Sequence, residues 1–409
     1  MGFKNAGGQY MAKIMVVAGG DWQIELVKKA KSMGHYVICS NLYEDSPAFI
    51  YADACEVSDV LDKERNLEIA KKYMPDAVIS DQSDIAVTTV AYLNEKLGLR
   101  GIGMEKADLF TDKSAQREFC REKGIAVSDY KICMAPEDAV PLLEKYGKIV
   151  IKPIDSQSSR GVYTIENRNQ LEEKYMSSIA WSNRRKAFLA EEYIDGDEFT
   201  IDGIVINGHH YPLCISVKEM YPKNLNISRT QRFSYLSDQY DYELLRKTNK
   251  ELIETIGLPM GLTHSEYRVR NGTCILIEAG ARGGGSNLSG KIVPFMSGID
   301  HYEYLIKEAL GDEADETDVK NCIFNTDRYA VMRFFDFGEG IVDRVEGVDV
   351  LKSHPMMIDY QIKIQPGDVL KQPEYGRLRP GHFIIGADDK EAVIKEEKKI
   401  LEAVRVVLR

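Results

Sequence analysis

Residues 264–285, HSEYRVRNGTCILIEAGARGGG, hold the most informative group of polar residues in the chain. Two runs rich in apolar residues flank Asn271-Gly272, a pair typical of the tight turn of a β-hairpin. The second run is expected to be largely buried, yet it ends on Glu278, and a hairpin brings Glu266 to the same end. Two carboxylates beside Arg282 and bare glycine backbone suit Mg²⁺ that carries a polyphosphate. A plain hairpin with two exposed acids explains this segment equally well.

The bulk composition narrows the classes of function. A chain of 409 residues with 44% hydrophobic residues is long enough for two or three domains. A net charge of −11 argues against general binding to nucleic acid. No apolar run approaches the roughly 20 residues of a membrane span, and no signal-peptide core precedes the first strand. Seven scattered cysteines without a CxxC pair fit reduced thiols, so we expect a cytoplasmic protein without nucleic-acid or membrane partners.

The N-terminal part alternates short apolar strands with helical patterns, after a polar, glycine-rich stretch at 1–10 that we expect to be a flexible leader. The strands are predicted at residues 13–17, 36–39 and 77–80, and the helices at 22–33 and 63–73. Such alternation predicts a parallel, Rossmann-like α/β layer.

A glycine turn and a group of polar residues mark the ends of two of these strands. Gly19-Gly20 follows the first strand, but the full G-x-G-x-x-G fingerprint is absent, so a plain NAD(P) enzyme is disfavoured. Ser80, Asp81 and Asp84 lie just past the third strand, at the edge where parallel sheets bind ligands. They are candidate substrate contacts.

Two lysines in the middle of the chain suit an anionic ligand. Lys113 opens a helix predicted over 113–123, where it is otherwise an ordinary surface lysine. Lys152 ends a buried strand at 149–153, which is costly unless the ammonium meets an anion. The small, hydroxyl-rich loop at 155–162 follows at once and can offer backbone N–H groups to phosphate oxygens.

Two further segments are candidates for nucleotide and substrate contacts. Residues 188–203 run from an apolar strand into acids and a turn, a pattern that can present backbone groups to a purine and a carboxylate to ribose. Residues 216–240 are polar with little periodicity, which predicts a mobile loop over a site. Its cations Lys218, Arg229 and Arg232 either bind an anion or are simply solvated.

The C-terminal part follows an acidic linker at 312–318. Strands are predicted around 329–335, 358–364 and 382–385, with a closing helix over 390–407. We find no catalytic grouping of residues in this part of the sequence.

Taken in order, these segments resemble the ATP-grasp superfamily, and within it the carboxylate–amine ligases such as L-amino acid ligases. The resemblance covers residues 11–409 and is most specific between Lys113 and Gly285. It implies an α/β fold with α+β character in the grasp region. Its three parts are a Rossmann-like domain with a parallel sheet over 11–110, an ATP-grasp domain over 111–318 and an α/β subdomain over 319–409.

The resemblance also implies roles for individual residues. Glu266 and Glu278 match the acids that bridge Mg²⁺. Arg282 matches the arginine that steadies the acyl phosphate, and it is the expected catalytic residue together with Lys152. The residues implied to bind ATP are Lys113 and Lys152 beside the phosphates, Ser158, Ser159 and Gly161 in the small loop, Glu191, Tyr193 and Ile194 at adenine, and Glu198 at ribose.

The sequence departs from the family pattern at Gly280. Many members carry asparagine there, two residues after the second metal acid, as a further metal ligand. With glycine at this position, coordination is expected to depend more on Glu278, water and phosphate oxygens. One consequence is that binding of a second metal ion stays open.

The implied activity joins a small-molecule carboxylate to an amine through an acyl phosphate, with ATP and Mg²⁺ or Mn²⁺ as cofactors; homodimers are common in the superfamily. His264, beside the metal hairpin, is a candidate for substrate contact or amine deprotonation, or is structural. Two alternatives are an ATP-grasp enzyme that uses bicarbonate or formate, and a non-catalytic nucleotide sensor.

Overall fold

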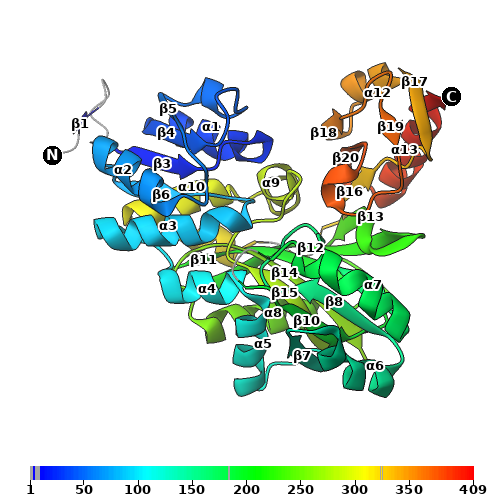
Figure 1. Ribbon diagram of the computed structural model, residues 1–409. Coiled ribbons are helices and arrows are strands. Elements are labelled where there is room, and N and C mark those ends of the chain that lie inside the picture. Colours follow the sequence, from blue (N-terminus) through cyan, green and yellow to red (C-terminus); the bar gives the residue numbers. More distant parts are fainter. Residues whose placement is uncertain (1–2, 5–9, 183–184, 323, 325) are drawn as a thin grey trace.

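The computed structural model describes residues 3–4, 10–182, 185–322, 324 and 326–409 (Figure 1). Most of the leader expected at 1–10 lies outside the described residues. Its described ends pair as the two-residue strands β1 (Phe3–Lys4) and β2 (Tyr10–Met11). No helix in these described ranges is both long and apolar enough to cross a bilayer.

The N-terminal part is the predicted parallel α/β layer. Its sheet has the order β5-β4-β3-β6, and all its pairings are parallel. The strands are β3 (Lys13–Val17), β4 (Tyr36–Asn41), β5 (Ala54–Val57) and β6 (Ala77–Ile79), and the helices are α1 (Ile24–Ser32), α2 (Lys63–Tyr73) and α3 (Asp84–Leu97). The apolar strands are buried between helices, which explains why their sequences are almost continuously hydrophobic.

A second, smaller sheet lies in the middle of the chain. Helices α4 (Met104–Thr111) and α5 (Lys113–Glu122) lead into it, and its order is β7-β10-β8-β9, all antiparallel. These strands are β7 (Tyr130–Cys133), β8 (Ile149–Pro153), β9 (Tyr163–Ile165) and β10 (Phe188–Glu192). Helices α6 (Val140–Tyr146) and α7 (Arg168–Ile179) pack against this sheet and close its core.

An eight-stranded antiparallel sheet joins the middle of the chain to its C-terminal part. Its order is β15-β14-β11-β12-β13-β16-β20-β18. The strands are β11 (Glu198–Ile206), β12 (His209–Tyr221), β13 (Asn224–Ser234), β14 (Gly261–Arg270), β15 (Thr273–Gly280), β16 (Tyr329–Phe334), β18 (Met357–Ile362) and β20 (Gly381–Ala387). Because β16 pairs with β13, the sheet continues across the domain boundary that the sequence predicts after residue 318. The boundary itself stays a prediction.

The prediction of a mobile loop over 216–240 is wrong for most of this segment. Strands β12 and β13 form a long hairpin inside the large sheet. Lys218, Met220, Ser228 and Gln231 of this hairpin line a cavity. Polar residues on that face hide the apolar alternation by which a half-buried strand is usually identified.

The remaining elements cover the large sheet and complete the C-terminal part. The helices are α8 (Tyr242–Ile256), α9 (Val293–Ser297), α10 (His301–Leu310), α11 (Thr317–Lys320), α12 (Val348–Ser353) and α13 (Lys390–Ala403). A small sheet has the order β19-β17-β21, formed by β17 (Gly340–Glu346), β19 (Val369–Leu370) and β21 (Arg405–Leu408). The closing helix predicted to 407 therefore ends at Ala403, because the β-branched residues after it pair with β17.

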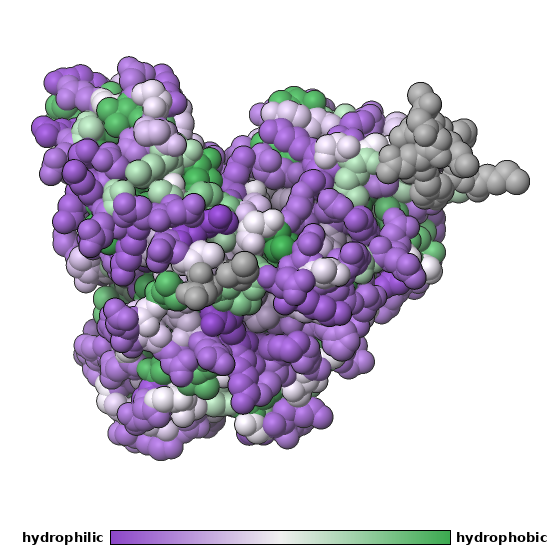
Figure 2. All heavy atoms as spheres, turned by 180° about the vertical axis from the view of Figure 1, so that it is seen from behind, coloured by the Kyte–Doolittle hydropathy of each residue, from purple (hydrophilic) through white to green (hydrophobic). Residues whose placement is uncertain are grey.

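The N-terminal and C-terminal parts lie on the same side of the middle part. Figure 1 shows them as two separate lobes above the middle part, and the lobe of the C-terminal part contains strands β16, β18 and β20 of the large sheet. Seen from behind, the surface is mostly hydrophilic, its apolar residues lie in small scattered groups, and a notch separates the two lobes (Figure 2).

Candidate active site

The hairpin predicted at the start is formed by β14 and β15. Asn271 and Gly272 have φ angles of 51° and 74°, the positive values that a type I′ turn requires. Glu266 lies directly opposite Glu278 in the strand register, and a bulge follows between Glu266 and Tyr267. Directly opposite residues of an antiparallel pair share one face of the sheet, so the hairpin places both carboxylates together.

Both carboxylates are held by lysines from other elements. Glu266 Oε1 lies 2.5 Å from Lys218 Nζ and 3.5 Å from His264 Nε2. Glu278 Oε1 lies 3.0 Å from Lys113 Nζ. Burial alone would raise the pKa of Glu266, but Lys218 and His264 outweigh burial and hold the pKa well below its ordinary value. Glu266 is therefore an anion before any ligand binds.

One cavity lies along the hairpin at Glu266, Arg268 and Glu278. The predicted nucleotide and metal residues that line it are Lys113, Lys152, Ser159, Glu191, Tyr193, Ile194, Glu198, Glu266 and Glu278. Ser158 lines a neighbouring cavity. Gly161 lines neither of the two, and its backbone is in the left-handed region at φ 70°. A Cβ there would lie 2.8 Å from Pro153 Cγ, so the glycine allows the loop to pack closely.

Lys152 and Glu191 belong to a buried charge network. Lys152 Nζ forms an ion pair with Glu191, whose other oxygen lies 2.5 Å from Arg117 Nε and accepts a bond of 2.9 Å from Ser128. Arg117 is fully buried and also donates to the carbonyl of Ile277. Burial raises the pKa of Glu191, but the two cations outweigh it and lower the pKa to about 2.

Desolvation by burial lowers the pKa of Lys152, although Glu191 opposes that shift. Sequence reasoning missed Arg117, because its partner Glu191 lies 74 positions away along the chain. The role of Glu191 near adenine stays a prediction.

Arg268 organises the opposite wall of the same cavity. Its guanidinium contacts Glu198 at 3.1 Å and donates to the carbonyl of Ile194 at 2.6 Å. Glu198 also lies 2.8 Å from Lys218, so the expected ribose acid is fixed from two sides. The ring of Tyr193 lies beneath the ammonium of Lys148, 4.0 Å from its centroid. Arg268 thus fixes both the backbone at Ile194 and the carboxylate of Glu198. Sequence reasoning also missed this arginine.

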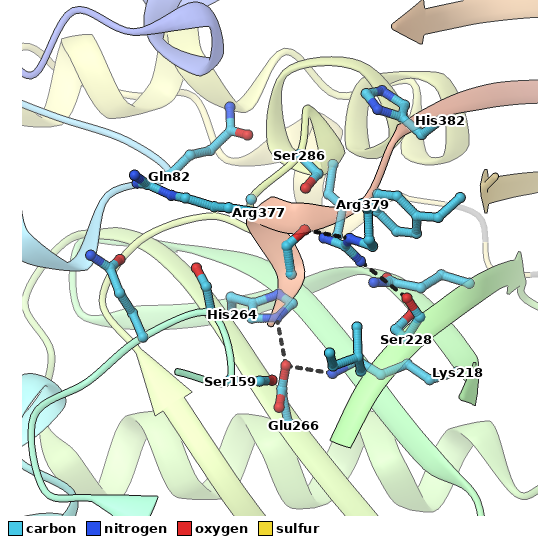
Figure 3. Close-up of a pocket in the computed structure, with 18 of the residues that line it drawn as sticks. Gln82, Ser159, Lys218, Ser228, His264, Glu266, Ser286, Arg377, Arg379 and His382 are labelled. Atoms are coloured by element: carbon cyan, nitrogen blue, oxygen red, sulfur yellow. Dashed lines mark hydrogen bonds and ion pairs between the residues drawn. The ribbon is translucent and has the colours of Figure 1, made fainter. Parts of the chain in front are cut away.

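A second, larger cavity adjoins the first and lies along the hairpin at His264, Glu266 and Gly280 (Figure 3). It shares Ser159, Glu198, Glu266 and Glu278 with the first, so the carboxylates stand where the two cavities meet. Residues from all three parts of the chain line it. Trp22, Gln82 and Asp84 come from the N-terminal part, and Lys363, Arg377, Arg379 and His382 from the C-terminal part.

Arg282 reaches this second cavity and is anchored to the N-terminal part. Its Nε and Nη2 donate to the two oxygens of Asp84 at 2.9 and 3.1 Å. The glycines that follow are held by carboxylates, since Gly283 N donates to Asp81 and Gly284 N to Asp202, each at 2.7 Å. The Gly-rich segment is therefore a fixed turn.

His264 is a hydrogen-bond donor in this setting. Its Nδ1 lies 3.1 Å from Asp202 and its Nε2 faces Glu266. Burial lowers the pKa of His264, but Asp202 and Glu266 outweigh burial and raise it to about 9. The ring is charged at neutral pH, so it does not suit the deprotonation of an amine considered from the sequence.

Gly280 faces the Asp84–Arg282 ion pair. It lies opposite His264 in the hairpin, and a Cβ at this position would lie 3.5 Å from Asp84 Oδ1 and 3.6 Å from Arg282. Across the described residues, no three His, Cys, Asp or Glu side chains are grouped closely enough to hold a metal ion. The oxygen donors that remain, from Glu266 and Glu278, fit Mg²⁺, which commonly takes one or two carboxylates and completes its shell with phosphate and water.

The C-terminal part contributes a basic group to the second cavity, formed by Lys363, Arg377 and Arg379. No catalytic grouping was found there in the sequence. Arg379 stacks on Phe334 at 3.3 Å, donates to the Gly376 carbonyl at 2.7 Å and to that of Ser228 at 3.1 Å. Gly376 N in turn donates to the carbonyl of Ser158 in the small loop at 3.3 Å. The signal in the sequence was Arg377 and Arg379 within the turn segment 376–381.

Two family models match the chain. Residues 146–289 match the ATP-grasp domain, and residues 333–409 match the L-amino acid ligase C-terminal domain 2. The first range contains both hairpin acids and Arg282, and the second contains the basic group.

Curated relatives share part of the chain. A formate-dependent phosphoribosylglycinamide formyltransferase of Erythrobacter litoralis is 31% identical over 46% of this chain and 49% of its own length. An alanine–anticapsin ligase of Bacillus subtilis is 27% identical over 62% of this chain and 58% of its own length. The chain thus spans about half the length of these relatives.

Solved structures share the whole fold. An L-amino acid ligase from Bacillus licheniformis superposes with a TM-score of 0.80 at 18% identity, covering 97% of this chain and 99% of the other. A phosphoribosylglycinamide synthetase from Anaerococcus prevotii gives a TM-score of 0.72 at 16% identity, covering 97% and 100%. The chain therefore contains an ATP-grasp domain over residues 146–289 and the C-terminal domain of the L-amino acid ligases over residues 333–409, and it shares the fold of these solved structures.

Proposed function

We propose that this protein is an ATP-dependent ligase that joins a carboxylate to an amine through an acyl phosphate and releases ADP and phosphate. The observation that carries the proposal is the position of Glu266 and Glu278 at the junction of two cavities. One cavity has the lysines and the acid that suit a nucleotide. The other is polar, and Arg282 points toward it.

ATP is assigned to the smaller cavity. Lys113 and Lys152 reach it with buried ammonium groups, and the small loop at 156–162 lies beside them. We assign Glu198 to the ribose hydroxyls, and Tyr193 and Ile194 to the purine. A polyphosphate there would exchange the lysine–carboxylate contacts of the free protein for phosphate contacts.

Mg²⁺ is assigned to Glu266 and Glu278, and when bound it would neutralise charge on the transferring phosphoryl group. In the free protein, the ammonium groups of Lys113 and Lys218 lie against these acids, in the region assigned to the metal ion. Mn²⁺ suits the same oxygen donors.

Two bond exchanges make up the reaction. A carboxylate oxygen of the first substrate attacks the γ-phosphorus of ATP, and the bond to the β–γ bridging oxygen breaks, so that ADP leaves. The amine nitrogen then attacks the acyl carbon, the bond from that carbon to the phosphate oxygen breaks, and the nitrogen releases a proton to solvent. Arg282, Lys152 and the protonated His264 stabilise negative charge on the oxygens.

The basic group supports a substrate with an additional negative charge. Lys363 and Arg377 line the larger cavity, and neither forms an ion pair within 4.0 Å with any residue in the described ranges. Both side chains are exposed, so their charges are accessible to an incoming carboxylate or phosphate, with which they can form charged hydrogen bonds. We therefore assign the far end of this cavity to an anionic group of the acid or the amine.

The test is phosphate release from ATP and Mg²⁺, screened over pairs of carboxylates and amines that carry or lack an additional anionic group. The proposal predicts release that requires both members of a pair. Release that requires only bicarbonate or formate would favour the ATP-grasp alternative based on those acids. Slow ADP formation that no acid or amine changes would favour a nucleotide sensor and contradict the ligase.

A further inference from the structure

A third cavity lies between helix α3 and the start of strand β14. Its walls are mainly apolar, contributed by residues such as Val78, Ile79, Val87, Val90, Met260 and Leu262. None of the functions assigned above uses it. Arg282 lines both this cavity and the large polar one.

The cavity follows one face of α3. Ser83, Val87, Val90 and Asn94 line it at spacings of four, three and four residues, which is one stripe of a helix. Eleven residues of helix span about 16 Å at 1.5 Å per residue. Arg282 holds Asp84 at the beginning of this helix, so the arginine marks one end of the slot and Asn94 the other.

Both ends carry polar groups that suit a ligand. Arg282 supplies a guanidinium, and the hydroxyl of Ser83 does not cap α3. At the other end, Asn94 is 3% exposed, and its Oδ1 has no hydrogen-bond partner, although its Nδ2 donates to Val78. A buried acceptor without a partner is costly, and a donor on a ligand would satisfy it.

We propose that this slot receives the apolar chain of the carboxylate substrate, with the carboxylate at Arg282 and the chain along α3. The inference rests on the proposed function, because Arg282 is there the group beside the acyl phosphate. It names the substrate class as a carboxylic acid with an extended aliphatic chain, whose far end can carry an N–H or O–H for Asn94. The amine is left to the polar cavity with the basic group.

Chain-length dependence tests the slot. Hydroxylamine replaces the amine, so that each activated acid is trapped as a hydroxamate with ATP and Mg²⁺. The probes are straight-chain alkanoates and straight-chain 2-amino acids of two to eight carbons. In the unmodified protein, KM should fall about fourfold for each added methylene until the slot is full. A KM that does not change with chain length in either series would overturn the proposal.

Filling the slot should remove that dependence. Val87→Phe should leave KM for the shortest acid within about twofold and abolish the gain from longer chains. Val350→Phe is the matched control, since Val350 lies on helix α12 and is 37% exposed. It should behave as the unmodified protein. If Val87→Phe does not fold, Val87→Ala decides, because a wider slot should extend the gain to longer acids. An unaltered chain-length profile in the folded Val87 variant would refute the assignment.

The slot can also be tested apart from the reaction. If no acid yields a hydroxamate, the proposed function fails, and calorimetric titration of octanoate and 2-aminooctanoate in the presence of ADP addresses the slot alone. Binding that Val87→Phe or Val87→Ala alters, and Val350→Phe does not, would support the cavity as an acid-binding site. Absence of binding would overturn it.

Discussion

The two cavities that meet at Glu266 and Glu278 differ in how their charges are balanced. On the nucleotide side, the buried charges are paired within the protein, as in the network of Lys152, Glu191 and Arg117. On the far side of the larger cavity, Lys363 and Arg377 have no ion-pair partner among the residues that the structure places.

The charged groups on the nucleotide side are thus fixed in the free protein, whereas Lys363 and Arg377 can pair only with a bound ligand. Paired buried charges are fixed before ATP arrives, which lowers the cost of reorganisation during phosphoryl transfer. Unpaired cations gain their partner only when an anionic substrate enters. Substitutions on the two sides should therefore have different signatures.

The largest effect is expected at the junction. Glu278→Gln and Arg282→Ala should each reduce turnover by about 10²–10³-fold, because they remove charge beside the transferring phosphoryl group or acyl phosphate. Phosphate release under saturating ATP measures this. Glu339→Gln, an exposed acid, serves as the control for loss of charge. Ordinary turnover in either junction variant would refute the site.

Removing the charge on Glu191 should reduce stability as well as activity. Glu191→Gln leaves Lys152 and Arg117 buried without their counter-charge, at a cost of about 3–5 kcal/mol in the free energy of unfolding by urea. Glu192→Gln, which breaks an ion pair with the exposed Arg270, should cost less than about 1 kcal/mol.

The pH dependence of unfolding also distinguishes the unmodified protein from the Glu191→Gln variant. Because the pKa of Glu191 is lowered to about 2, its ionised form stabilises the fold above its ordinary pKa of 4.5, and that contribution is lost as the pH falls toward 2. The Gln variant should lose less stability than the unmodified protein between pH 4.5 and 2. Equal losses would contradict the pairing.

On the unpaired side, binding should change more than stability. Arg377→Ala should raise KM for the anionic substrate about 10–100-fold, the effect of one charged hydrogen bond, with little change in kcat. The melting temperature should stay within a few degrees, since no internal ion pair is lost. Lys371→Ala, an exposed lysine outside this cavity, is the control. A large loss of stability in Arg377→Ala with KM unchanged would reverse the comparison.

His264 should give the smallest effect, with the opposite pH dependence to Glu191. Its pKa is raised to about 9, so its charged form stabilises the fold fully below pH 6.5, and the contribution is lost as the pH rises through 9. The difference in unfolding free energy between the unmodified protein and His264→Gln should be about 1–3 kcal/mol at pH 6 and smaller at pH 9.5. A difference that grows with pH would show that the ring is neutral.

Local signals in the sequence predicted the parts of the site that depend on short stretches. Asn271-Gly272 defined the hairpin, which placed Glu266 opposite Glu278, and the lysine at the end of a buried strand identified Lys152. The N-terminal parallel sheet followed from the alternation of strands and helices.

What the sequence could not predict depends on contacts between distant segments. The polar face of the β12–β13 hairpin resembles a loop until the cavity that it lines is known. Arg117 and Arg268 are ordinary arginines until Glu191 and Glu198 are seen beside them. The basic group lies far from the hairpin in sequence, and only the fold brings it to the same cavity.

The most direct test of the central claim follows oxygen from the acid to the phosphate. An acid that supports phosphate release is labelled with ¹⁸O in both carboxylate oxygens, and the released phosphate is examined by mass spectrometry. An acyl phosphate predicts one ¹⁸O atom in each released phosphate and none in ADP. Unlabelled phosphate would show that the carboxylate never attacks the γ-phosphorus, and it would contradict the proposed ligase.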